Sequence, residues 1–253
     1  MDGRLNATVA LVTGASSGIG EATAMTLARE GAAVAVTARR GDRLAELCDR
    51  IRDGGGTALA LTADMTDEAQ VREAVERTVA ELGRLDTLVN NAGLMILGPA
   101  AGATTREWRS MVDINLTGLM NTTHVALPHL VSAAADGPRR VADIVNVSSV
   151  AGRIAFAGSS AYCATKYGVV AFSEALRQET AAHHVRVSVV EPGSVDTELR
   201  DHNSPAVQEA LTRRFGGIDR LQSQDIADAI GYIVGRPRHV AVAEMLVRPT
   251  QQV

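Results

Sequence analysis

Short apolar runs alternate along this chain with longer segments whose apolar residues recur at helical spacing. The runs, such as 9–12, contain almost no polar residue, which predicts strands buried on both faces. The longer segments end in glycines such as Gly31 and Gly83, which suit helix C-termini. The predicted strands are 9–12, 33–36, 58–61, 85–89, 143–147, 185–190 and 244–248; the predicted helices lie around 18–30, 44–51, 71–82, 104–131, 160–181, 205–214 and 224–234.

This alternation predicts the architecture. Strand–helix–strand units in series form parallel sheets with right-handed crossovers. We therefore expect an α/β protein with a three-layer, doubly wound parallel sheet of Rossmann type. No repeat or linker interrupts the pattern, and residues 133–140 are interpreted as a loop between a helix and a strand. Residues 1–253 are expected to form a single domain.

Composition and charge narrow the class of protein. Lys and Arg total 25 against 29 Asp and Glu, so the formal net charge of −4 argues against a nucleic-acid partner. No apolar run reaches the roughly 18 residues of a membrane span. The N-terminus lacks a signal-peptide pattern, and the two cysteines lack metal-ligand spacing, so we expect a cytoplasmic protein without a metal site.

A glycine-rich turn follows the first predicted strand and opens the first predicted helix. Glycines there permit a tight turn and a close approach of the backbone to a pyrophosphate, while the helix N-terminus directs free N–H groups at it. A plain strand–helix turn is the alternative, but the position after the first strand favours a dinucleotide site. The predicted contacts are Gly14, Ser16, Ser17, Gly18, Ile19 and Gly20.

The end of the second strand indicates which dinucleotide binds. An acidic residue there binds the ribose hydroxyls of NAD, whereas a basic residue accepts the 2′-phosphate of NADP. This chain has Arg39 and Arg40 and no acid before Asp42. Arg39 can present its guanidinium to the phosphate, and Arg40 stacks on the adenine or adds charge. We expect NADP(H), the alternative being a solvated arginine pair.

A tyrosine and a lysine provide a candidate for proton transfer. Tyr162 and Lys166 stand four positions apart, which places both on one face of the predicted helix. An ordinary tyrosine has a pKa of about 10. A lysine ammonium within several ångströms favours the phenolate, so we expect the pKa of Tyr162 to be lowered towards the working pH of an acid/base catalyst.

Taken together, five motifs in this order resemble the short-chain dehydrogenase/reductase family. They are the turn at 13–20, the segment 90–93, Asn115, Ser149 with 162–166, and the segment 192–197. The resemblance implies a catalytic set of Asn115, Ser149, Tyr162 and Lys166, with Ser149 preferred over its neighbour Ser148 by spacing. In that set Asn115 holds a water that connects Lys166 to solvent.

The resemblance also implies further cofactor and substrate contacts. Asp64 would accept from the adenine amino group, although an acid before Thr66 also reads as a helix start. The other implied cofactor contacts are Met65, Asn91, Ala92, Gly93, Tyr162, Lys166, Pro192, Gly193, Val195 and Thr197. The implied substrate contacts are Ser149, Tyr162, Met95, Ile154 and Phe156, with residues 198–217 as a lid.

Several functions remain open at this point. The resemblance implies an oxidoreductase that uses NADPH to reduce an aldehyde or ketone, and the segments 38–40, 192–200 and 244–253 are similar to aldehyde reductases of secondary metabolism in antibiotic-producing bacteria. The same site could oxidise a small alcohol, polyol or hydroxy acid. A non-catalytic NADP(H) sensor is a third possibility, disfavoured by the intact tyrosine and lysine. A homo-oligomer is implied, a tetramer more than a dimer.

Overall fold

A seven-stranded, entirely parallel sheet forms the centre of the computed structural model, which describes residues 3–252. Its strand order is β3-β2-β1-β4-β5-β6-β7. The order reverses between β1 and β4, and such a switch point opens a crevice at the carboxyl ends of the strands. The strands are β1 (Val9–Thr13), β2 (Ala33–Ala38), β3 (Ala58–Thr62), β4 (Thr87–Asn90), β5 (Ala142–Val147), β6 (Val185–Pro192) and β7 (Glu244–Val247).

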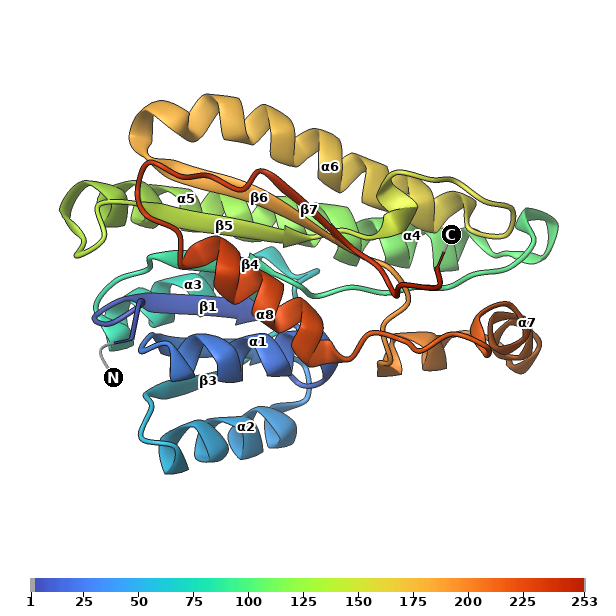
Figure 1. Ribbon diagram of the computed structural model, residues 1–253, viewed down its shortest axis with the longest axis horizontal. Helices are drawn as coiled ribbons and strands as arrows, with labels where there is room; N and C mark the ends of the chain where they lie inside the picture. The colour runs from blue at the N-terminus through green and yellow to red at the C-terminus, as the bar shows by residue number, and fades with distance from the viewer. Residues whose placement is uncertain (1–2, 253) are drawn as a thin grey trace.

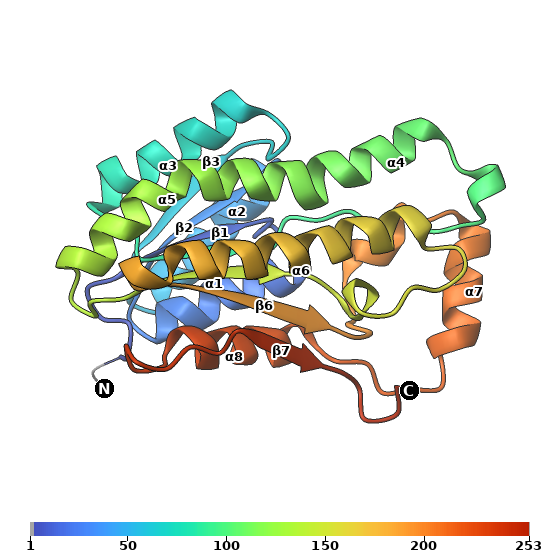
Figure 2. The same ribbon diagram turned by 90° about the horizontal axis from the view of Figure 1, so that it is seen from above.

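Helices cover both faces of the sheet (Figure 1 and, from above, Figure 2). Buried side chains of α1 (Gly18–Arg29), α2 (Gly41–Asp53) and α8 (Ser223–Val234) share one hydrophobic core with the sheet. Those of α3 (Glu68–Leu82), α5 (Gly118–Asp136) and α6 (Ser160–Thr180) share the other. The predicted three-layer, doubly wound architecture is confirmed.

The uniform apolar strands follow from these two cores. In β1, Ala10 and Val12 pack into the core beside α1, whereas Leu11 between them packs into the core beside α3 and α5. Successive side chains of a strand point to opposite faces, so both sets must be apolar when both faces are covered.

The structure differs in two ways from the long helix predicted at 104–131. It is interrupted, because α4 (Thr105–Val112) is followed by a turn of π-helix, Asp113–Thr117, before α5 begins. It also continues to Asp136, so the loop predicted at 133–140 is wrong in its first half. Ala133 and Ala134 belong to α5 and are buried in the hydrophobic core that this helix covers. Their burial favours a continued helix, although the small residues of this segment did not indicate one.

The segment after β6 extends beyond the carboxyl ends of the strands. It contains a short 3₁₀ turn, Glu198–His202, and α7 (Pro205–Phe215), which stands apart from the sheet in Figure 1. Shorter 3₁₀ turns lie at Ala100–Gly102, Val150–Gly152 and Ala181–His183. Within residues 3–252, none of the helices combines the length and the apolar character that crossing a membrane requires.

Candidate active site

A cavity of about 740 Å³ opens at the carboxyl ends of the central strands and collects most of the predicted site residues. Only Gly20, Asn115 and Ile154 of the predicted set do not line it. The predicted residues that do are Gly14, Ser16, Ser17, Gly18, Ile19, Arg39, Arg40, Asp64, Met65, Asn91, Ala92, Gly93, Met95, Ser149, Phe156, Tyr162, Lys166, Pro192, Gly193, Val195 and Thr197.

The glycine-rich turn fits a dinucleotide phosphate. Gly14 adopts a φ of +65°, and a Cβ there would lie 2.7 Å from the Cα of Ala92, so only glycine fits. Ser17, Gly18 and Ile19 bring the N-terminus of α1 to the cavity wall. Gly20 instead allows α1 to pack closely against Asn91, because a Cβ at Gly20 would lie 2.5 Å from Nδ2 of Asn91. An anion in the cavity would therefore meet free helix N–H groups.

The arginines after β2 form a polar cluster with the turn. Nη2 of Arg40 donates to Oγ of Ser16 at 2.9 Å and to Oγ of Ser17 at 2.8 Å. The guanidinium of Arg40 is thus anchored to the phosphate turn, which favours its predicted role as added charge over adenine stacking. Arg39 lines the same part of the cavity wall.

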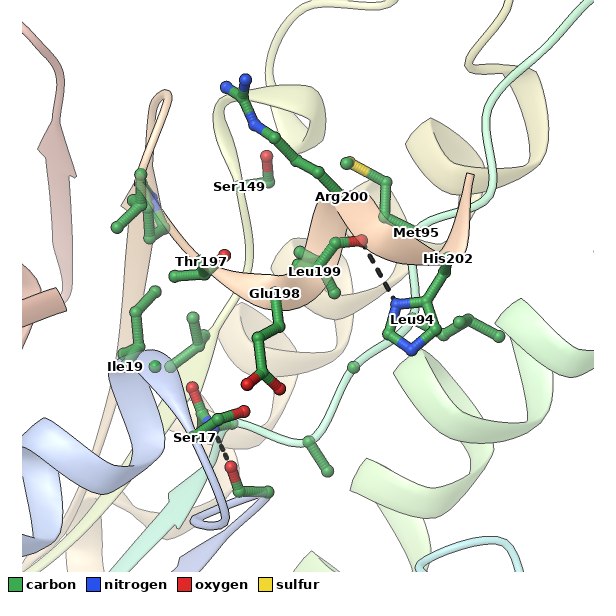
Figure 3. A pocket seen from close by; sticks show the side chains of 18 of the residues that line it. Ser17, Ile19, Leu94, Met95, Ser149, Thr197, Glu198, Leu199, Arg200 and His202 are labelled. Atoms are coloured by element: carbon green, nitrogen blue, oxygen red, sulfur yellow. Dashed lines mark hydrogen bonds between the residues drawn. The ribbon is translucent and has the colours of Figure 1, made fainter. Parts of the chain in front are cut away.

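An acid from the predicted lid completes this cluster. Glu198 accepts hydrogen bonds from Nη1 of Arg40 at 2.8 Å and from Nη1 of Arg43 at 2.6 Å. Figure 3 shows its carboxylate pointing towards Ser17. The hydrogen bonds from Arg43 and Arg40 lower the pKa of Glu198 to about 2. The sequence analysis missed Glu198 and Arg43 as partners, because they lie far apart in the chain.

Asp64 caps the turn after β3, which agrees with its interpretation as a helix-start acid. Its Oδ1 accepts hydrogen bonds from the backbone N–H of Thr66 at 2.9 Å and from its hydroxyl at 2.8 Å. The residue also lines the cavity. Asp64 therefore organises the local turn at the cavity wall, and its contact with an adenine stays a prediction.

Tyr162 and Lys166 both lie on α6 and face the cavity, as the spacing predicted. Burial raises the pKa of Tyr162 to about 12, while its hydrogen bond with Ser149 acts in the opposite direction. The predicted lowering of this pKa is therefore wrong for the free protein. Lys166 is itself buried, and burial lowers its pKa to about 8. Desolvation penalises both charged forms more than their proximity compensates.

Asn115 lies behind the cavity wall in the π-helical turn. Its Oδ1 accepts from the N–H of Leu94 at 2.7 Å, and its Nδ2 donates to the carbonyl of Leu94 at 2.8 Å. A Cβ on Gly93 would lie 3.4 Å from Oδ1 of Asn115 and 4.0 Å from Nζ of Lys166. Asn115 therefore fixes the chain after β4 next to Lys166.

One predicted substrate contact falls outside the cavity. Ile154 lies in the loop after Ser149 with 49% of its surface exposed, and it is not part of the cavity wall. The family resemblance implied a pocket position for Ile154, but the residue follows the short 3₁₀ turn at Val150–Gly152 and lies outside the wall. Val150 and Ala151 occupy the wall instead, and Ser194, Arg200 and Gln252 contribute polar groups that the sequence analysis did not assign.

Comparison with known proteins decides the family. A family model described as short chain dehydrogenase matches residues 8–208. The chain belongs to the short-chain dehydrogenase family. The prediction of an oxidoreductase of this family is thereby confirmed.

Three relatives illustrate the range of this short-chain dehydrogenase family. Glycine betaine reductase ATRR of Emericella nidulans is 39% identical over 99% of this chain, which spans only 19% of that protein's length. Sulfoacetaldehyde reductase 2 of Chromohalobacter salexigens is 37% identical over 96% of this chain and 95% of its own length. The closed form of serine dehydrogenase, solved with NADP⁺, has a TM-score of 0.88 and 31% identity, covering 97% of this chain and 96% of the solved chain.

Proposed function

We propose that this short-chain dehydrogenase uses NADPH to reduce the carbonyl group of an aldehyde or ketone, with Tyr162 as the proton donor. The observation that carries the proposal is the convergence of Ser149, Tyr162 and Lys166 on the cavity that the glycine-rich turn also enters. A hydride acceptor bound between the Ser149 and Tyr162 hydroxyls would share that space with the end of a dinucleotide.

The chain's own groups account for the proton. The hydroxyls of Ser149 and Tyr162 are hydrogen-bonded to each other in the free protein. A carbonyl oxygen bound there would replace this mutual bond and accept one hydrogen bond from each hydroxyl as negative charge develops on it. With a pKa raised to about 12, Tyr162 carries its proton at neutral pH. A Tyr162 hydroxyl that still carries its proton can donate it to a carbonyl oxygen, which supports the reductive direction. Lys166, buried beside the ring, would supply positive charge as Tyr162 loses its proton.

The phosphate turn and the arginine cluster support NADP(H) as the cofactor. Bound NADPH supplies the hydride. Arg39 and the anchored Arg40 would bind its 2′-phosphate, and the N-terminus of α1 its pyrophosphate. The NADP⁺ in the serine dehydrogenase structure supports the same cofactor here. Residues 198–217 would act as the lid of a single domain comprising residues 1–253.

Oxidation of a small alcohol, polyol or hydroxy acid is the second candidate function. The same hydroxyl pair serves both directions, and a relative 34% identical to this chain, from Rhizobium radiobacter, is named serine 3-dehydrogenase. Secondary metabolism remains our proposal for the setting. It rests on the similarity of the segments 38–40, 192–200 and 244–253 to aldehyde reductases of antibiotic-producing bacteria.

We also propose a homotetramer in the cytoplasm. Trp108, Val112 and Tyr167 expose apolar surface on the neighbouring helices α4 and α6. Tyr232 on α8 and Leu246 on β7 are two further exposed apolar side chains. The exposed apolar side chains on α4 and α6 suit a subunit interface, and the preference for a tetramer over a dimer rests on the family resemblance. Both cysteines are buried free thiols, in keeping with a reducing compartment. Analytical ultracentrifugation would test the stoichiometry.

The function is tested by following the loss of NADPH absorbance with a panel of aldehydes and ketones. We expect turnover with NADPH to exceed turnover with NADH. NADP⁺ with a panel of alcohols and hydroxy acids measures the reverse direction in the same assay. NADPH binding without turnover in either direction would contradict the proposal and favour a sensor that only binds the dinucleotide.

A further inference from the structure

Two oppositely charged side chains, Glu198 and Arg200, extend in opposite directions from the short turn at Glu198–His202. In Figure 3, Glu198 points towards Ser17 and the phosphate turn, whereas Arg200 extends in the opposite direction, past Ser149 in this view. Glu198, Arg200 and Ser149 all line this one cavity. The turn therefore places a cationic side chain on the wall of the same cavity that the hydroxyls of Ser149 and Tyr162 line.

The guanidinium of Arg200 is held in a defined position. Its Nη2 donates to Oγ of Ser194 at 2.5 Å. The N–H of Ser194 in turn donates to Oε1 of Gln252 at 2.8 Å, so the end of the chain supports the same wall. Arg200 is partly buried, and this burial lowers the pKa of its guanidinium. A partly desolvated cation at a cavity wall is stabilised by an anionic ligand.

The backbone of Arg200 is fixed as well. The side chain of Asn203, almost fully buried, donates from Nδ2 to the carbonyl of Arg200 and to the carbonyl of Met95, each at 3.0 Å. Its Oδ1 accepts from the N–H of Leu97 at 2.7 Å. Asn203 thus joins the turn that carries Arg200 to the segment after β4 that lines the cavity. A bound substrate would contact an Arg200 whose position is fixed before binding.

We propose that Arg200 binds an anionic group of the substrate, a carboxylate or a sulfonate, while Ser149 and Tyr162 hold the carbonyl oxygen. The inference rests on the proposed carbonyl reduction and adds the substrate class. The wall of the same cavity also has apolar parts, contributed by Met95, Val150, Phe156 and Leu199. The favoured substrate is therefore an aldehyde or ketone with a short hydrocarbon spacer and a terminal anion.

The test compares carbonyl substrates that carry the anionic group with partners that lack its charge. Rates of NADPH oxidation are measured for ω-oxo acids of increasing length, from glyoxylate to 6-oxohexanoate, and for their methyl esters. Sulfoacetaldehyde and acetaldehyde form a second pair and distinguish a sulfonate site from a carboxylate site. We expect the wild-type kcat/KM for the best anion to exceed that for its neutral partner at least about 10-fold, as expected for a hydrogen bond between charged groups.

Arg200→Gln should lower the kcat/KM for the anion about 10- to 100-fold, mainly through KM, and leave the neutral partner within about 3-fold. Arg200→Lys, which keeps the charge, should recover part of the loss. Arg106→Gln removes one positive charge from an exposed position outside the cavity and should change neither rate. NADPH titrations of each variant report whether the cofactor site is intact.

The outcomes distinguish a failure of the proposed anion site from a failure of the proposed carbonyl reduction. If wild type and Arg200→Gln show the same anion-to-neutral ratio while both turn over carbonyls, the anion site is refuted and the reductase stands. If wild type binds NADPH but turns over none of these carbonyls, the proposed reduction fails and the anion site fails with it.

Discussion

Nζ of Lys166 lies 5.8 Å from the centroid of the Tyr162 ring and donates a hydrogen bond to the carbonyl of Val147 at 2.9 Å. The ammonium is therefore held by the end of β5 while it faces the ring of the proposed proton donor. Burial shifts the pKa values of these two groups in opposite directions, to about 12 for Tyr162 and about 8 for Lys166. The next two predictions follow from this arrangement.

Tyr162→Phe removes the proposed proton donor without removing the ring. We expect turnover to fall about 100-fold or more, the size of a general-acid contribution, with NADPH affinity within a few-fold of wild type. Steady-state rates and a fluorescence titration with NADPH measure the two effects. Near-normal turnover would exclude Tyr162 as the donor.

The pH dependence of reduction should report Lys166. Because its pKa is lowered to about 8, Lys166 loses its charge as the pH rises through that value. We expect kcat/KM for reduction to be high below about pH 8 and to decline above it, as an apparent value of the coupled pair. In Lys166→Arg, whose guanidinium stays charged, the decline should move to higher pH. A decline at the same pH in both enzymes would assign it to another group.

Arg39→Asp should reverse the cofactor preference. The change removes a cation from the cavity wall and introduces an acid that repels the 2′-phosphate and can bind ribose hydroxyls. We expect the NADPH/NADH ratio of kcat/KM to fall at least about 10-fold, since charge-assisted hydrogen bonds are among the strong ones. Arg72→Asp, at an exposed position outside the cavity, serves as the control. An unchanged ratio in Arg39→Asp would refute the role of Arg39.

Glu198→Gln should improve the use of NADPH. The Glu198 carboxylate occupies Arg40 and Arg43, as an anionic ligand would, so it competes with a cofactor phosphate for both guanidinium groups. The pairs are exposed, so we expect only a fall of about 2- to 5-fold in the KM for NADPH and little change for NADH.

Glu174→Gln is the matched control for Glu198→Gln. Glu174 is also exposed, pairs with Arg177 and has its pKa lowered to about 2 by that hydrogen bond, but it lies outside the cavity. A higher KM for both cofactors in Glu198→Gln would instead show that the ion pairs hold the lid over the cofactor.

Asn203→Ala should loosen the turn that carries Arg200. The substitution leaves the N–H of Leu97 and the carbonyl of Met95 without this partner. We expect the free energy of unfolding to fall by about 1–3 kcal/mol and the KM for the carbonyl substrate to rise more than the KM for NADPH. Urea unfolding and steady-state kinetics check the two effects. Equal changes in both KM values would argue against a local role at the substrate wall.

Local sequence patterns were sufficient to predict the layers of the fold and the characteristic residues of the site. Buried strands and amphipathic helices follow from local periodicity, so the parallel fold could be predicted. The glycine-rich turn and the spacing of Tyr162 and Lys166 are also local, because the backbone geometry of a turn or a helix alone places those residues. The structure contains these features, and the helices and strands begin and end close to the predicted positions.

The closure of the cavity and the charges on its wall depend on contacts between segments that are distant in the chain. Glu198 meets Arg40 across 158 positions of the chain, Asn203 meets Leu97 across 106, and Gln252 meets Ser194 across 58. No local pattern encodes such pairs. The same holds for the exposure of Ile154 and the raised pKa of Tyr162. Both depend on which distant segments exclude water from a side chain, and burial is a property of the packed molecule.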